Sequence, residues 1–209
     1  MTKIAYLYVF DTMADWEPGF LIGELNTGRY FQKDAEKYIV RTVGITKDPV
    51  VTMGGVRISP DIGIDEFKTA DAGVLILPGG NTWLEDIHDP LLDKVNEFLD
   101  TGILVAAICG ATMGLAKYQL LDSRPHTSND LGYLKAVCPT YGGEKFYRQD
   151  AVVADDNLVT ASGVAPLEFA HEVLKKLGVF SPKTLEAWYQ LYVTHEPQYF
   201  YELMGSLEQ

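Results

Sequence analysis

The chain is poor in cysteine, because its 209 residues contain only Cys109 and Cys138. Two cysteines are too few for a disulfide framework in a protein of this size, and reduced thiols are typical of the cytosol. The first eleven residues, MTKIAYLYVFD, lack the small-residue cleavage site of a signal peptide. No segment approaches the run of roughly 18 apolar residues that spans a bilayer. We therefore expect a cytoplasmic protein that does not span a membrane.

Basic residues are also scarce: 17 Lys and Arg stand against 29 Asp and Glu, which gives a net charge of -12. This balance argues against binding to nucleic acid or to an anionic membrane surface, because both need a basic footprint. Histidine occurs four times, and no histidine has metal-ligand spacing to another histidine or to a cysteine. We expect no metal site and no cofactor.

Internal repeats and low-complexity tracts are missing too. Instead, apolar runs of strand length alternate with helical patterns, which is typical of an α/β fold with a mostly parallel sheet. No linker divides the chain, so we predict a single domain over 1–209. Strands are predicted at 3–10, 38–46, 72–80 and 103–108, hairpins at 50–60 and 151–162, and helices at 16–31, 89–102, 110–120, from about 128, and at 166–178.

An aromatic-rich helical tail is predicted at about 181–203, with a break at Pro197. Its aromatic side chains offer apolar surface for a subunit interface, or for packing on the domain itself. The sequence leaves both alternatives open. The residues concerned are Trp188, Tyr189, Tyr192, Tyr199, Phe200 and Tyr201.

The apolar run ILVAAICGATMGLA, residues 103–116, leads from a predicted buried strand through Cys109 into a predicted helix. A cysteine in this position is often a small core residue. Here small residues surround it, as a sharp strand-to-helix turn requires, which favours a nucleophile elbow. Such a turn would place the sulfur at a helix N-terminus, where backbone N–H groups and the helix dipole favour the thiolate. We therefore expect Cys109 to be a nucleophile of low pKa.

Two further loops are predicted at the same edge of the sheet, because the carboxyl ends of parallel strands meet there. The strand LILPGG ends in Gly79 and Gly80, whose N–H groups, with that of Gly110, are suited to hold an oxyanion beside the cysteine. The first strand is followed by DTMADWE, which carries Glu17. An acid at the start of a helix is normally only a favourable dipole partner, but this one could touch Cys109.

Taken together, four stretches resemble the ThiJ/PfpI superfamily, the class I glutamine-amidotransferase-like group, and within it the bacterial intracellular-protease-like branch. They are VFDTMADWE, ADAGVLILPGG, VAAICGATMGLA and LVTASGVAPLEFAHEVLKKLG, in order over roughly residues 3–178. The resemblance implies a flavodoxin-like three-layer sandwich, a reactive Cys109 and an assembly as a homodimer. It also implies that Glu17 hydrogen-bonds this cysteine and that Gly80 and Gly110 bind an oxyanion.

The sequence departs from this family at the residue that would act as the catalytic base. In many relatives a histidine follows the elbow, whereas alignment of LLDSRPHTSNDLGYL places Asn129 at that position. Asparagine cannot act as a base. His126 lies three residues earlier, and it is either a base after a local shift or a polar residue on a short strand or loop. Trp83 either lines the pocket or covers the sheet edge, and His88, in a polar turn, is expected to be solvated.

Two functions of different classes follow from these residues. The first is a cysteine-dependent hydrolase-like or lyase-like enzyme that acts on a small carbonyl or amide substrate, in the manner of a glyoxalase, deglycase or amidase. The alternative is a stress-response or redox-sensing protein without turnover, in which Cys109 is oxidised. The apparent replacement of the histidine by Asn129 favours the second function, and the oxyanion loops favour the first. A protease ranks third, because it would need a base.

Overall fold

A seven-stranded sheet forms the centre of the protein in the computed structural model, which describes residues 2–207. The strand order is β5-β2-β1-β6-β7-β9-β8, and every pair is parallel except β8 with β9. A separate antiparallel pair joins β3 (Val50–Val51) to β4 (Arg57–Ile58). The strands of the main sheet are β1 (Thr2–Tyr8), β2 (Lys37–Gly44), β5 (Ile62–Gly63), β6 (Ala72–Leu77), β7 (Leu104–Ile108), β8 (Val152–Ala154) and β9 (Leu158–Ala161).

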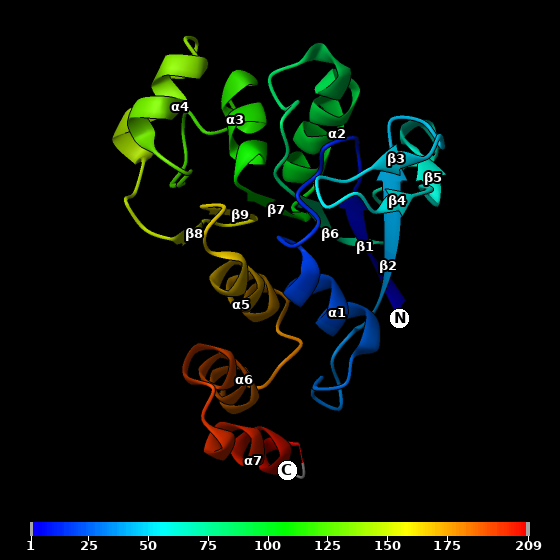
Figure 1. Ribbon diagram of the computed structural model, residues 1–209, viewed down its shortest axis with the longest axis vertical. Helices are drawn as coiled ribbons and strands as arrows, with labels where there is room; N and C mark the ends of the chain where they lie inside the picture. Colours follow the sequence, from blue (N-terminus) through cyan, green and yellow to red (C-terminus); the bar gives the residue numbers. More distant parts are fainter. Residues whose placement is uncertain (1, 208–209) are drawn as a thin grey trace.

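Helices cover both faces of this sheet, so the predicted α/β sandwich of three layers is confirmed (Figure 1). On one face lie α1 (Gly19–Thr27) and α5 (Pro166–Leu177), and on the other lie α2 (Asp89–Asp100) and α3 (Gly110–Lys117), with α4 (Leu131–Val137) beside α3. Three short 3-10 helices connect these elements: η1 (Ile64–Glu66), η2 (Asp86–His88) and η3 (Glu144–Phe146). The central strand β7 is buried along its whole length, which explains its continuous apolar sequence.

Several helix ends differ from the prediction for local reasons. Helix α1 begins at Gly19 rather than at residue 16, after Pro18, so that Glu17 lies in the preceding loop. Helix α3 ends at Lys117 rather than at residue 120, because Gln119 adopts a left-handed conformation with a φ of 58° that cannot continue it. Helix α4 begins at Leu131, since the Asp130 side chain accepts a hydrogen bond from the N–H of Tyr133 and caps it.

The carboxyl ends of the four central strands meet at one edge of the sheet. Leu7 pairs with Ile76, Leu77 with Ala107, and Ile108 with Ala161, so β1, β6, β7 and β9 end at similar heights. The loops that follow these strands therefore converge, and those after β1, β6 and β7 carry Glu17, Gly80 and Cys109.

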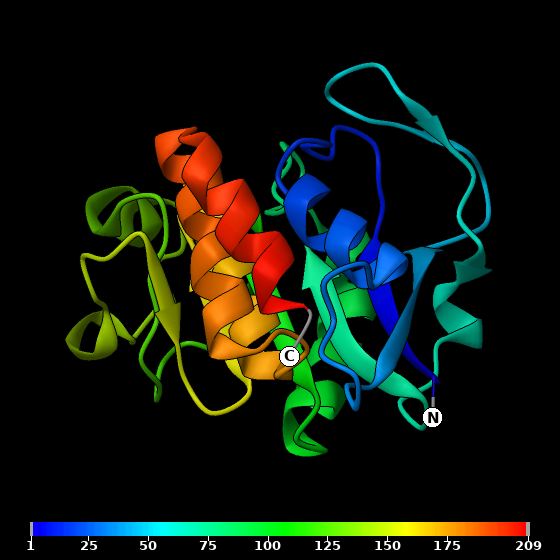
Figure 2. The ribbon, with the colours of Figure 1, turned by 90° about the horizontal axis from the view of Figure 1, so that it is seen from below.

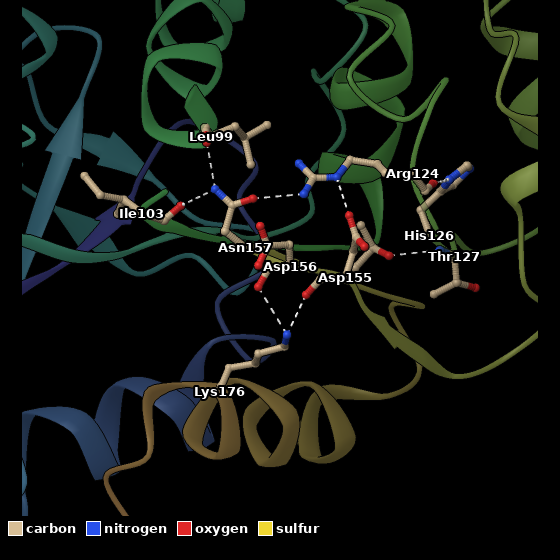
Figure 3. A network of polar contacts seen from close by, with 10 residues as sticks. Leu99, Ile103, Arg124, His126, Thr127, Asp155, Asp156, Asn157 and Lys176 are labelled. Carbon is tan, nitrogen blue, oxygen red and sulfur yellow. Dashed lines mark hydrogen bonds and ion pairs between the residues drawn. The ribbon is translucent and has the colours of Figure 1, made fainter. Parts of the chain in front are cut away.

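A polar network holds the opposite edge of the sheet together (Figure 3). Arg124 Nε donates to Asp155 Oδ2 at 2.7 Å, and its Nη2 donates to Asn157 Oδ1 at 2.9 Å. The Asn157 amide then donates to the carbonyl of Leu99 at 2.8 Å, and Lys176 Nζ of α5 donates to the carbonyl of Asp155 at 2.6 Å. These contacts tie both helical layers to the start of β9, far along the strands from the site.

The tail folds back on its own chain, as the second of the two alternatives left by the sequence has it, while Phe200 and Tyr201 remain exposed. Helices α6 (Pro182–Thr194) and α7 (Pro197–Ser206) pack against each other, and α6 packs on α5, outside the helical layer (Figures 1 and 2). Trp188 is fully buried, and its Nε1 donates to Glu24 Oε1 of α1 at 3.1 Å. Glu24 is also buried and pairs with Arg29. Across residues 2–207, no helix has the length and apolarity needed to cross a membrane.

The contact between Trp188 and Glu24 predicts that the tail contributes to the stability of the whole chain. Replacement Trp188→Phe should lower the free energy of unfolding by about 2 kcal/mol, because a buried carboxylate loses a hydrogen bond. Urea unfolding measures this change. Trp16→Phe is the control, since Trp16 is 53% exposed, and equal losses in the two variants would contradict the prediction.

Candidate active site

Cys109 occupies the sharp turn that the sequence predicts between a buried strand and a helix. Strand β7 ends at Ile108 and α3 begins at Gly110, so the turn consists of this one residue. Its φ of 59° and ψ of -124° are strained for a residue with a side chain. The N–H of Cys109 donates to the carbonyl of Ala161 at 3.0 Å, and its own carbonyl accepts the Thr112 hydroxyl at 2.7 Å. These bonds hold the strained backbone in place.

Two glycines from neighbouring loops leave room for the sulfur. A Cβ atom added to Gly163 would lie 2.6 Å from Cys109 Sγ, and one added to Gly79 would lie 2.9 Å from it. Real Cβ atoms essentially never approach so closely, so neither position accepts a side chain without movement. Gly163 was missed by the sequence reasoning, although the segment ASGVA follows β9 and therefore had to reach this edge.

Glu17 lies beside Cys109, as the resemblance implies. Its side chain is buried, with 1% of the residue exposed, and its Oε2 accepts the N–H of Gly79 at 2.6 Å. Its Oε1 is buried without a well-aligned hydrogen-bond partner among residues 2–207, although the Cys109 thiol adjoins the carboxyl group. Burial raises the pKa of Glu17 to about 7, while the contacts with Gly79 and Cys109 lower it by less. Near neutral pH this carboxyl group is therefore present in both protonation states.

The pKa of Cys109 is raised, so the expectation of a low-pKa thiol is wrong for this structure. Burial is the main cause, and the charge of Glu17 adds to it. The Asn129 amide and the N–H of Gly110 at the start of α3 both lower the pKa, but by less than burial raises it. The N-terminus of α3 thus lowers the pKa of the thiol, as expected, but burial outweighs this effect. A protonated Glu17 removes the repulsive charge, so the thiolate forms more easily while Glu17 holds a proton.

Asn129 stands at the sulfur, where the sequence alignment placed it. Its Nδ2 donates to Cys109 Sγ at 3.3 Å, and its Oδ1 accepts the N–H of Gly163 at 2.8 Å. The bond to Gly163 fixes which end of the amide faces the sulfur, so that Asn129 acts as a donor there.

His126 does not reach Cys109, and the second of its two proposed roles applies. It is fully buried in an isolated bridge to Tyr147, so that it packs within the fold instead of lying on the surface. One ring nitrogen lies 2.8 Å from the carbonyl of Arg124, and the other lies 2.6 Å from the Tyr141 hydroxyl. Burial lowers its pKa. With both nitrogens engaged, His126 is not available as a base for the cysteine.

The oxyanion candidates Gly80 and Gly110 are brought together. A Cβ atom at Gly110 would lie 3.2 Å from the amide nitrogen of Gly80. It would also lie 2.9 Å from the ring of Trp83, which is fully buried. The Trp83 ring also packs against Tyr8 and Phe10 at the end of β1, which fits the second of its two predicted roles, covering the sheet edge. It packs behind the elbow, between the loop after β6 and helix α3.

His88 is fully buried, so the expectation that it is solvated is wrong. The polar sequence around it is exposed, but the histidine itself turns inward toward Tyr8 and Thr82. Cys138 is also buried, and its thiol donates to the carbonyl of Met113 at 3.5 Å. Within residues 2–207, no group of three or more His, Cys, Asp or Glu is arranged to hold a metal ion.

The raised pKa of Glu17 predicts a pH-dependent cost to stability. Between pH 4.5 and pH 7 the unfolded chain releases this proton while the folded chain keeps it, so the free energy of unfolding falls as pH rises. Glu17→Gln removes this loss. Relative to the native chain, the variant should therefore gain about 1–3 kcal/mol between pH 5 and pH 8. Urea unfolding of both proteins at the two pH values measures the gain, and a constant difference would contradict the assignment.

The crowding at Gly163 predicts a specific effect of one added methyl group. Gly163→Ala should lower the free energy of unfolding by about 1–3 kcal/mol and change the rate of Cys109 alkylation, because the methyl group displaces the sulfur. Gly23→Ala is the matched control, since a Cβ atom there meets nothing within 4 Å. It should leave alkylation unchanged, and an equal response of both variants would contradict the prediction.

Comparison with known proteins agrees with this fold. The chain is 58% identical over 206 residues to a protein of Bacillus subtilis (strain 168) named as an uncharacterized protease, YoaZ, covering 99% of this chain and 98% of that protein. A crystal structure of a ThiJ/PfpI family protein from Bacillus anthracis is 56% identical, with a TM-score of 0.97 and coverage of 100% and 99%. A glutathione-independent glyoxalase of Caenorhabditis elegans, DJR-1.2, is 27% identical over 136 residues, which is 64% of this chain and 70% of the glyoxalase. The model of the DJ-1/PfpI family matches residues 3–176, and the chain belongs to that family.

Proposed function

We propose that this protein is a cysteine-dependent enzyme that converts small α-oxoaldehydes, such as methylglyoxal, to hydroxy acids. The observation that carries the proposal is the pair of Cys109 and Glu17. Glu17 is buried, has a pKa of about 7 and adjoins the thiol. A group with this pKa both accepts and donates a proton near neutral pH, as a general acid–base catalyst must.

In the first step the Cys109 thiol adds to the aldehyde carbon. A carbon–sulfur bond forms, the carbonyl π bond opens, and the thiol proton is transferred to the new hydroxyl oxygen. Negative charge that develops on this oxygen is stabilised by the N–H groups of Gly80 and Gly110, two residues that are in close contact at the elbow. Asn129 Nδ2 supports the sulfur while it carries charge.

In the second step a proton moves between the two carbon atoms of the bound substrate. The Glu17 carboxylate removes the proton from the carbon attached to sulfur and returns it to the neighbouring carbon. The hydroxyl proton meanwhile moves from the oxygen of the first carbon to the oxygen of the second, which leaves a thioester on Cys109 and a hydroxyl group on the neighbouring carbon. Water then cleaves the thioester, releasing the hydroxy acid and restoring the thiol. The net reaction adds one water molecule and needs no oxidant, reductant or cofactor.

Cleavage of a peptide is less well supported by the same residues. The leaving amine of a peptide needs a proton donor that reaches it after attack. Asn129 cannot supply a proton as a histidine would, and both nitrogens of His126 are bound elsewhere. The names of the relatives do not decide between a protease and a glyoxalase. One relative is called a protease, and a more distant one is called a glyoxalase.

Redox sensing at Cys109 is the alternative function. Peroxide reacts with the thiolate, and burial raises the pKa of this thiol, which argues against rapid oxidation. The presence of Asn129 at the position of a base is compatible with a protein without turnover. The experiment below therefore also tests redox sensing.

The rate of hydroxy-acid formation from methylglyoxal tests the proposal. Cys109→Ala should abolish turnover, and Glu17→Gln should lower kcat by at least about 100-fold, because it removes the proton carrier. Cys138→Ala is the control, since the second thiol bonds to Met113 within the fold. Equal rates for Cys109→Ala and the native chain would refute the enzyme. No turnover by any protein, with stoichiometric oxidation of Cys109 by mild peroxide, would support sensing instead.

A further inference from the structure

His88 connects three segments of the fold that are separate in sequence. It ends η2, immediately before α2, and its Nδ1 lies 2.7 Å from the hydroxyl of Tyr8 at the end of β1. Its Nε2 lies 2.9 Å from the hydroxyl of Thr82, in the loop after β6. Burial lowers the pKa of His88 to about 4, so the ring is neutral at physiological pH and uses one nitrogen as donor and one as acceptor. A polar ring with both nitrogens satisfied fixes the distance between β1 and this loop.

The ring of His88 also contacts the aromatic side chains behind the site. It stacks on Trp83 with ring centroids 4.8 Å apart and an angle of 24°, and it meets the edge of Phe10 at 4.9 Å. Trp83 in turn donates from Nε1 to the carbonyl of Pro78 at 2.8 Å. The histidine therefore holds the loop 78–83 at both ends, through Thr82 directly and through Trp83 to Pro78.

This loop supplies two of the backbone N–H groups of the site. Gly79 donates to Glu17 at 2.6 Å, and Gly80 lies beside Gly110 at the elbow. The ring of Phe10 fills the space at Gly80, where a Cβ atom would lie 2.4 Å from it. A shift of the loop would lengthen the bond from Gly79 to Glu17 and move Gly80 away from Gly110.

We propose that His88 is a positioning residue that holds the loop 78–83, and with it the N–H groups of Gly79 and Gly80, in register with Glu17 and Cys109. The role of the positioned groups rests on the proposed function, whereas the placement of the loop does not. His88 touches none of the reacting atoms and acts through Thr82 and Trp83.

The experiment separates positioning from simple filling of the core. His88→Phe keeps an aromatic ring next to Trp83 and removes both hydrogen bonds, but it leaves the buried Tyr8 hydroxyl without a partner. The double variant Tyr8→Phe with His88→Phe removes that hydroxyl as well and should recover most of the lost stability. Thr82, which is only partly buried, then lacks its bond to the ring in both variants.

Alkylation of Cys109 by iodoacetamide as a function of pH, followed by mass spectrometry, reports the ionisation of Glu17 through its effect on the thiolate. An inflection in the alkylation rate against pH that is absent in Glu17→Gln is assigned to the ionisation of Glu17. In the double variant we expect this inflection to move upward by about half a pH unit or more, because a weaker bond from Gly79 stabilises the carboxylate less. For methylglyoxal we expect kcat to fall about 10-fold with little change in KM. His171→Phe, a partly buried histidine on α5, is the control and should change neither quantity.

A double variant that recovers its stability and shows the native alkylation profile would overturn the proposal, because His88 would then only fill space. If the native chain does not turn over methylglyoxal, the proposed function fails, but the alkylation profile still decides the role of His88. A shifted profile in Thr82→Val, which removes the loop side of the same hydrogen bond, would support positioning by an independent change.

Discussion

The steric crowding around the sulfur of Cys109 is the constraint on which the rest of the site depends. The backbone takes a strained turn there, with a φ of 59°, and two glycines from the loops after β6 and β9 close in on the sulfur. A strained backbone conformation persists only where several surrounding contacts hold it in place. Here the surroundings are the convergent ends of parallel strands, so the sheet register determines where the sulfur lies.

The same crowding explains the electrostatics of the site. Close packing buries Glu17 and leaves Cys109 only partly exposed, and burial raises the pKa of both groups. Two neighbouring acids in such a place do not readily carry charge together, so ionisation of one suppresses ionisation of the other. The N–H groups of Gly79 and Gly110 and the amide of Asn129 then decide where a single negative charge resides.

The features that the sequence predicted well are those with a local pattern. Apolar runs indicated the central strands, and the small residues around Cys109 indicated the turn, because both depend on neighbours in the chain. The burial of His88 depends on Tyr8, 80 residues away, while its own segment EDIHDP is polar and mostly exposed. The prediction of a low pKa for the Cys109 thiol was wrong for a related reason. A helix N-terminus is a local feature, whereas desolvation is a property of the whole fold.

Asn129 limits the chemistry that this arrangement supports. Its carbonyl oxygen is committed to Gly163, so its NH₂ group faces the sulfur and cannot remove a proton from it. The charged side chain that acts on Cys109 is that of Glu17, and this carboxyl group is bound to Gly79 on the loop that also carries Gly80. A proton held there can travel between atoms of a small substrate attached to the sulfur. Neither Asn129 nor His126 can carry this proton on to a leaving group farther away, which is consistent with the proposed rearrangement of small carbonyl compounds and argues against cleavage of long chains.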